Sequence, residues 1–116
     1  MNRMLVLLAT AAAGLSLVAS SAAAPVKLTG TVGPSFTITL KKGSTKVRKL
    51  KAGKYTFVIH DKSNIHNFHL MGPVSKMFTS VSFTGTKTVT LKLKPGKYTY
   101  VCDPHASSMR GSFRVS

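Results

Sequence analysis

Acidic side chains are nearly missing from this chain. Only two of its 116 residues, Asp61 and Asp103, carry a side-chain carboxylate, against 17 lysines and arginines. Acid–base catalysis by carboxylates needs a pair of them at one site, and the sequence shows no Ser-His-Asp order that would supply a nucleophile instead. The composition therefore argues against an enzyme.

The chain also has no apolar run long enough to span a bilayer. The longest, from Met4 to Val18, falls short of the roughly 20 residues required. A basic start precedes it and small residues follow it, which is the three-part pattern of a secretory signal peptide. We expect cleavage after Ala23 to remove residues 1–23. The remaining domain, residues 24–116, should be secreted or periplasmic, with no stable membrane insertion.

Cysteine is equally scarce, since Cys102 is the only one in the chain. An internal disulfide is therefore excluded, although small exported domains often rely on one. An unpaired thiol in an oxidising compartment is a liability unless something occupies it. Cys102 is thus either a buried, inert residue or a ligand of a metal.

Long helical periodicity is absent after the apolar run. Short stretches rich in Thr, Val, Ile, Phe and Tyr recur about every ten residues and are broken by Gly and Pro, which is typical of a β-sandwich or barrel. We predict an all-β, eight-stranded Greek-key β-sandwich. Its expected core contains Phe57, Ile59, Phe68, Tyr100 and Val115. The candidate strands are 26–28, 35–40, 46–50, 54–60, 66–71, 80–83, 87–93, 97–102 and 111–115.

A sequence pattern that occurs twice indicates where the cysteine lies. Residues 50–59 and 93–102 share the pattern Leu-Lys-x-Gly-Lys-Tyr-Thr-aromatic-Val, a turn that leads into a strand. Side chains alternate across a strand, so Tyr98, Tyr100 and Cys102 should share one face. If the tyrosines point into the core, the thiol lies below the surface.

The predicted mature domain is strongly positively charged. Without Arg3, 16 basic residues face two acidic ones, a net charge of about +14. Many lysines alternate along segments 41–54 and 87–97, as on the solvent face of a strand. They form either a solvated outer face or an electropositive surface for an acidic partner or an anionic envelope surface. Nucleic acid is not expected, because the protein is predicted to be exported and no recognition helix is evident.

One stretch carries three metal-binding side chains. Cys102, His105 and Met109 follow the spacing Cys-x2-His-x3-Met, and Pro104 stiffens the turn between the first two. A thiolate, two imidazoles and a weakly bound methionine form the ligand set of blue-copper electron-transfer sites. The stretch therefore lacks only a second histidine.

His66 and His69 are the candidates for that histidine. If their segment is extended, His66 shares a face with Phe68, while His69 lies on the opposite face. Only one of them can therefore face the site, and we predict that it is His66. We expect His60 and His69 to be surface or edge residues.

The motifs His66-Asn67 and Cys102-Asp-Pro-His105, followed by Met109, resemble those of the small blue-copper proteins, the cupredoxins, such as plastocyanin and pseudoazurin. The resemblance spans residues 26–115. It implies that His66, Cys102, His105 and Met109 bind one copper ion. It also implies that Asn67 ties the two ligand loops together and donates a hydrogen bond towards the thiolate, and that electrons pass through the exposed edge of His105.

The chain departs from plastocyanin in three respects. The segment between His105 and Met109 is one residue shorter, and Val101 replaces an aromatic residue before the cysteine. The acidic patch that plastocyanin uses for its partners has no counterpart here. Its docking partner is therefore not carried over.

The favoured function is transfer of single electrons by a monomeric, exported copper protein, with an acidic redox protein or an anionic envelope surface as partner. The alternatives are an envelope copper carrier or buffer without a redox role, and a metal-free adhesion or structural sandwich. For electron transfer we expect an apolar patch around His105, formed by Pro34, Met71, Pro73, Pro104 and Ala106.

Overall fold

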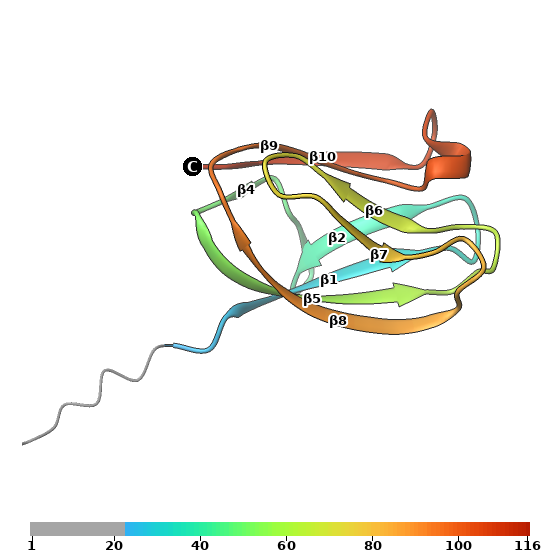
Figure 1. Ribbon diagram of the computed structural model, residues 1–116, viewed down its shortest axis with the longest axis horizontal. Coiled ribbons are helices and arrows are strands. Elements are labelled where there is room, and N and C mark those ends of the chain that lie inside the picture. Colours follow the sequence, from blue (N-terminus) through green and yellow to red (C-terminus); the bar gives the residue numbers. More distant parts are fainter. Residues whose placement is uncertain (1–22) are drawn as a thin grey trace, which may run out of the picture.

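The computed structural model describes residues 23–116, which form two facing β-sheets (Figure 1). The first sheet has the strand order β3-β2-β1-β5-β8, with β1 Val26–Val32, β2 Ile38–Lys42, β3 Thr45–Lys46, β5 Gly53–Asp61 and β8 Gly85–Leu93. The second has the order β4-β10-β9-β6-β7, with β4 Lys49–Leu50, β6 Phe68–Met71, β7 Lys76–Thr79, β9 Gly96–Val101 and β10 Arg110–Val115. A 3-10 turn, η1 (Asp103–His105), follows β9.

The predicted all-β sandwich is confirmed, and the described residues contain no α-helix. Two of the strand segments, β3 and β4, are only two residues long, and eight are longer. The predicted signal peptide, residues 1–23, lies outside the described residues except for its last one. From residue 23 onwards, no helix has the length and apolar character needed to cross a membrane.

Two of the strand predictions are wrong in more than the position of their ends. Residues 80–83 form a turn, closed by a bond from the Phe83 N–H to the Ser80 carbonyl, and the strand lies earlier at β7. The reason is burial: Phe78 points into the core, whereas Val81 is exposed. The predicted strand 46–50 divides into β3 and β4, which belong to different sheets.

The core fills the space between the sheets. All five predicted core residues are buried, and Tyr98, Tyr100 and Cys102 all lie inside as expected from the alternation along β9. Aromatic rings join the strands of the second sheet to one another. Phe68 stacks on Tyr100 at 5.6 Å between ring centroids, and Tyr98 stacks on Phe113 at 5.2 Å. Rings of this size bury large apolar areas and hold β9 firmly in place.

The repeated sequence pattern corresponds to a turn that is closed in the same way in both copies. The Tyr98 hydroxyl donates to the Lys94 carbonyl (2.8 Å) and accepts from the Lys94 N–H. In the other copy, the Tyr55 hydroxyl donates to the Lys51 carbonyl (2.6 Å). Each tyrosine therefore closes the turn four residues before it. The two closures fix the starts of β5 and β9, and β9 leads directly to Cys102.

Removing the Tyr98 hydroxyl should weaken the start of β9. We expect Tyr98→Phe to lower the free energy of unfolding by about 1 kcal/mol, because the Lys94 N–H and carbonyl lose their partner. Urea denaturation measures this change, and Tyr55→Phe should give a loss of similar size. Unchanged stability in both variants would show that the closures contribute nothing to the fold.

Candidate metal centre

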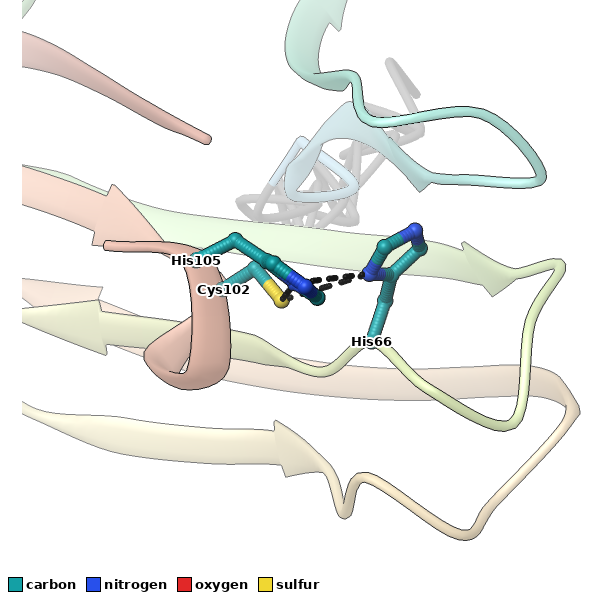
Figure 2. A group of neighbouring side chains, drawn as sticks. All are labelled: His66, Cys102 and His105. Carbon is teal, nitrogen blue, oxygen red and sulfur yellow. Dashed lines mark hydrogen bonds between the residues drawn. The ribbon is translucent and has the colours of Figure 1, made fainter. Parts of the chain in front are cut away.

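Three side chains from two loops meet at one end of the sandwich (Figure 2). Cys102 Sγ lies 3.6 Å from His66 Nδ1 and 3.5 Å from His105 Nδ1, and the two ring nitrogens are 3.2 Å apart. These are the only three His, Cys, Asp or Glu side chains among the described residues that cluster closely enough to share a metal ion. The structure thus brings His66, and not His69, to the cysteine, as predicted.

The size of this triangle fits a metal ion. A circle through three atoms at these separations has a radius of about 2.0 Å, and nitrogen and sulfur ligands bind first-row metals at about 2.0–2.3 Å. The donor set also fits, because a thiolate with two imidazoles is the combination that suits copper. An ion at the centre would satisfy all three atoms at once.

The second nitrogen of His66 supports the same conclusion. Nε2 is buried and has no hydrogen-bond partner among the described residues. A neutral imidazole carries its proton on one nitrogen only. With the proton on Nε2, the Nδ1 lone pair is free and points towards the thiol and the other ring. That arrangement leaves Nδ1 ready to bind a metal.

The loop after β9 is closed by its own backbone. The Cys102 N–H donates to the Met109 carbonyl at 3.0 Å, and the His105 carbonyl accepts from the Met109 N–H at 2.8 Å. The His105 N–H returns to the Cys102 carbonyl at 3.0 Å. Pro104 occupies the first turn of η1, where its missing N–H costs little. These bonds hold Cys102, His105 and Met109 in one rigid loop.

Met109 lies wholly in the interior. Its side chain is 0% exposed and belongs to the same buried cluster as Cys102. Burial alone is ordinary for methionine, which often fills gaps in a core. The position nevertheless leaves a thioether inside the closed loop, on the same side of the molecule as the three clustered donors.

Asn67 connects the two loops, as the family resemblance implied. Its side-chain oxygen accepts from the Asp103 N–H, and its amide donates to the Asp103 carboxylate, both at 2.7 Å. The amide also donates to the Met77 sulfur at 3.0 Å. No bond from Asn67 to Cys102 Sγ is present among residues 23–116, and the hydrogen bond towards the thiolate stays a prediction for the copper-bound protein. Asn67 instead acts on the residue that follows the cysteine.

His69 and His60 have partners away from the cluster. His69 Nδ1 lies 3.1 Å from both carboxylate oxygens of Asp103, and His60 Nδ1 lies 3.1 Å from the Thr86 hydroxyl. Burial tends to raise the pKa of Asp103, but the hydrogen bonds from Asn67 and His69 outweigh it and hold that pKa below its usual value. Asp103 is therefore the ionised centre of a clamp formed by Asn67, Asp103 and His69.

Phe36 borders the cluster, and the sequence interpretation missed it. Its ring meets the edge of His66 at 5.2 Å and of His105 at 5.0 Å between centroids, and the side chain is 60% exposed. The sequence predicts a strand over 35–40, which includes Phe36. The structure places it in the loop before β2, over the half-buried His105.

The apolar patch expected around His105 is wrong in one of its members. Pro73 lies against Gly96 at the start of β9, and Cys102 follows the other end of that strand, so Pro73 lies far from His105. Met71 pairs with Thr99 in the middle of β9. The error arose because β6 runs away from His66, and sequence distance alone did not give that direction.

The clamp can be tested by its effect on stability. We expect Asn67→Ala to lower the free energy of unfolding by about 1–3 kcal/mol, because the Asp103 N–H loses its partner and the carboxylate keeps only His69. Chemical denaturation of the protein without added metal measures this. Asn64→Ala is the control, since Asn64 is exposed three residues earlier. Equal effects of the two substitutions would contradict the role of the clamp.

Comparison with known proteins agrees with this geometry. The copper-binding proteins of the plastocyanin/azurin family match residues 35–116. A rusticyanin variant has the same fold, with a TM-score of 0.52 at 22% identity, over 78% of this chain and 76% of that one. A reduced amicyanin variant gives a TM-score of 0.51 at 19% identity, over 80% of this chain and 85% of that one. No curated protein sequence matches significantly.

The structural likenesses establish a shared fold, and the family match covers well over half of the chain. The cluster of His66, Cys102 and His105 supplies the donors that such a fold needs for its metal. The chain therefore belongs to the plastocyanin/azurin family of copper-binding proteins, the cupredoxins, and its cofactor is one copper ion.

Proposed function

We propose that this protein is a blue (type 1) copper protein that carries single electrons between redox partners. The observation that carries the proposal is the triangle of Cys102 Sγ, His66 Nδ1 and His105 Nδ1. When bound there, copper supplies one-electron exchange between Cu(I) and Cu(II). A thiolate with two imidazoles suits that exchange, because it accommodates both oxidation states.

The proposed ligands are His66, Cys102, His105 and Met109. The first three are supported by their mutual distances, and Met109 by its burial within the same closed loop. Pro104 and Asn67 support them from outside, through the turn and the clamp. Four ligands from the protein itself leave no position for a substrate, which favours electron transfer over catalysis.

The site is dry and rigid, as electron transfer requires. Cys102, His66 and Met109 have no exposed surface, so water is excluded from three of the four donors. The loop bonds and the clamp fix the donors before any metal arrives. A preorganised site of this kind moves little when its charge changes, which keeps the barrier to electron exchange low.

His105 is the proposed port for electrons. It is the one clustered donor that is only partly buried, and the exposed ring of Phe36 lies beside it. An apolar ring next to the port can lose its water against a partner, as contacts at the centre of an interface do. The net charge of about +14 on residues 24–116 favours an acidic partner protein.

We further propose that residues 24–116 form the mature, monomeric protein, exported into the cell envelope or beyond. Copper on Cys102 would explain a lone thiol in an oxidising compartment. An enzymatic role is not proposed, because Asp61 is buried and Asp103 is held in the clamp. Amicyanin, whose fold this chain shares, has been solved in both reduced and oxidised forms, which supports a redox role by analogy.

Colour is the first test of this function. The copper-loaded protein should absorb strongly in the visible range through charge transfer from the Cys102 sulfur to Cu(II). Cys102→Ser should abolish the band. Met109→Leu should keep the band and raise the reduction potential, because Cu(II) loses a donor. Visible spectroscopy and voltammetry measure both, and Met71→Leu, at an exposed methionine of β6, should change neither.

A colourless copper-loaded protein, or a Cys102→Ser variant that keeps the band, would contradict this proposal. The copper carrier would then be the better interpretation. It predicts rapid transfer of copper to a chelator, which the burial of three donors opposes.

Electron exchange between two copies of the protein tests the port without a known partner. We expect Phe36→Ser to slow self-exchange by about tenfold, equivalent to about 1.4 kcal/mol of lost encounter stability. Added salt should speed the exchange, since it screens two strongly positive molecules. NMR line broadening in mixtures of reduced and oxidised protein gives the rate. Val26→Ser is the control, because Val26 is exposed and starts β1, whereas His66 lies beside Gly33 after the other end of that strand. An equal effect there would contradict the proposed port.

A further inference from the structure

A second candidate site lies on the flank of the sandwich, on the outer face of β9 and β10. A pocket of about 350 Å³ opens there, where Thr99 and Ser112 face each other across the two strands. Basic side chains surround it from both strands and from the β3–β4 segment. Its lining consists of Lys46, Arg48, Lys97, Thr99, Arg110, Gly111 and Ser112.

A second pocket of about 340 Å³ shares a wall with the first. Lys46 and Arg48 line both, and the second pocket adds Lys42 and Lys49. The two hollows together form a basic trough with six cationic side chains: Lys42, Lys46, Arg48, Lys49, Lys97 and Arg110.

No side-chain carboxylate among residues 23–116 lines this trough. Asp61 is buried at the end of β5, and Asp103 is committed to Asn67 and His69. The single ion pair among residues 23–116 is that between His69 and Asp103. None of the six cationic side chains forms a side-chain hydrogen bond within these residues, so their donors remain available to a ligand.

The residue types suit phosphate groups. Arginine presents a planar fork that binds phosphate oxygens through two parallel bonds, and lysine adds a strongly attractive point charge. Thr99 and Ser112 add hydroxyl donors at the floor of the first pocket. Six like charges in two adjoining hollows also raise the local potential, which concentrates anions there.

The shape favours a linear ligand over a single ion, a membrane or a protein. Each pocket has the volume of a small-molecule site. Lys46 and Arg48 line both pockets, so a linear ligand can contact the cations of both. A flat bilayer does not enter two hollows. A protein partner needs an apolar centre, and the first pocket offers none. We propose that this trough binds successive phosphate groups of a linear polyanion.

Most of this site lies away from the proposed electron port. Phe36 and His105 lie at the copper end, whereas the trough extends along β9, β10 and β4. Of its cations, Arg110 lies nearest to the copper end, because it follows Met109. The polyanion could therefore hold the protein in place while His105 stays free for a redox partner. The inference does not depend on electron transfer, since it rests on charges and pockets alone.

The test compares two double variants that remove the same charge. Arg48→Gln with Lys97→Gln removes two trough cations, and Lys54→Gln with Lys92→Gln removes two exposed cations that pair across β5 and β8 in the other sheet. The probe is linear polyphosphate of about 15 phosphates, titrated calorimetrically into the copper-loaded protein at several salt concentrations. We expect the trough variant to weaken binding by about tenfold or more and to reduce the salt slope by about two. The other variant should change the affinity by less than about threefold.

Equal losses in the two double variants would overturn the proposal and leave only diffuse attraction by net charge. Inorganic phosphate that binds as tightly as the polymer would show a single-ion site, and polyglutamate of equal charge that binds as tightly would show no preference for phosphate. Tighter binding to phosphatidylglycerol vesicles would point to a membrane instead. Each of these results also contradicts the proposal.

Two further measurements test the proposal if a double variant fails to fold. Arg48→Lys should keep part of the affinity. NMR shifts of the unmodified protein should locate polyphosphate at Thr99 and Ser112.

Discussion

The alternation of side chains along β9 is the constraint on which the site depends. Tyr98 and Tyr100 point into the core and are held there by stacking on Phe113 and Phe68, so the next inward position beyond them belongs to Cys102. A shift of one residue in this strand would turn the thiol outwards and expose it to oxidants. The tyrosine closure at Lys94 fixes the start of the strand and therefore its register. The fold thus protects the one reactive group of the chain before any metal is bound.

The two ligand loops come from distant parts of the sequence, and a small polar network joins them. Asn67 follows His66 and binds both the N–H and the carboxylate of Asp103, which follows Cys102. One amide therefore sets the distance between the two segments. His69 completes the arrangement from the outer face of β6. One of the chain's only two side-chain carboxylates is used for this purpose, which explains why it stands beside the cysteine in so basic a protein.

The aromatic ring beside the proposed port and the basic trough lie on different parts of the molecule. The exposed ring of Phe36 lies at the copper end beside His105, and a basic trough lined by Arg48 and Lys97 lies on the flank. An apolar contact suits a brief encounter between proteins, because it releases water without requiring matched charges. A trough of cations suits a long-lived association with a polyanion, because many counterions are released. The two surfaces can therefore serve different partners.

The sequence by itself determined the fold class, the core positions in the strands and the identity of the clustered donors. Period-two alternation and turn residues are local signals, and the Cys-x2-His-x3-Met spacing is contained in one loop, so neither needs distant contacts to be recognised. Only the tertiary structure decided the rest. The strand at 76–79, the ring of Phe36 over His105 and the distance of Pro73 from the site all depend on the direction in which strands cross the sandwich. The trough likewise could not be predicted from the sequence, because its cations come from segments that meet only after the second sheet has formed.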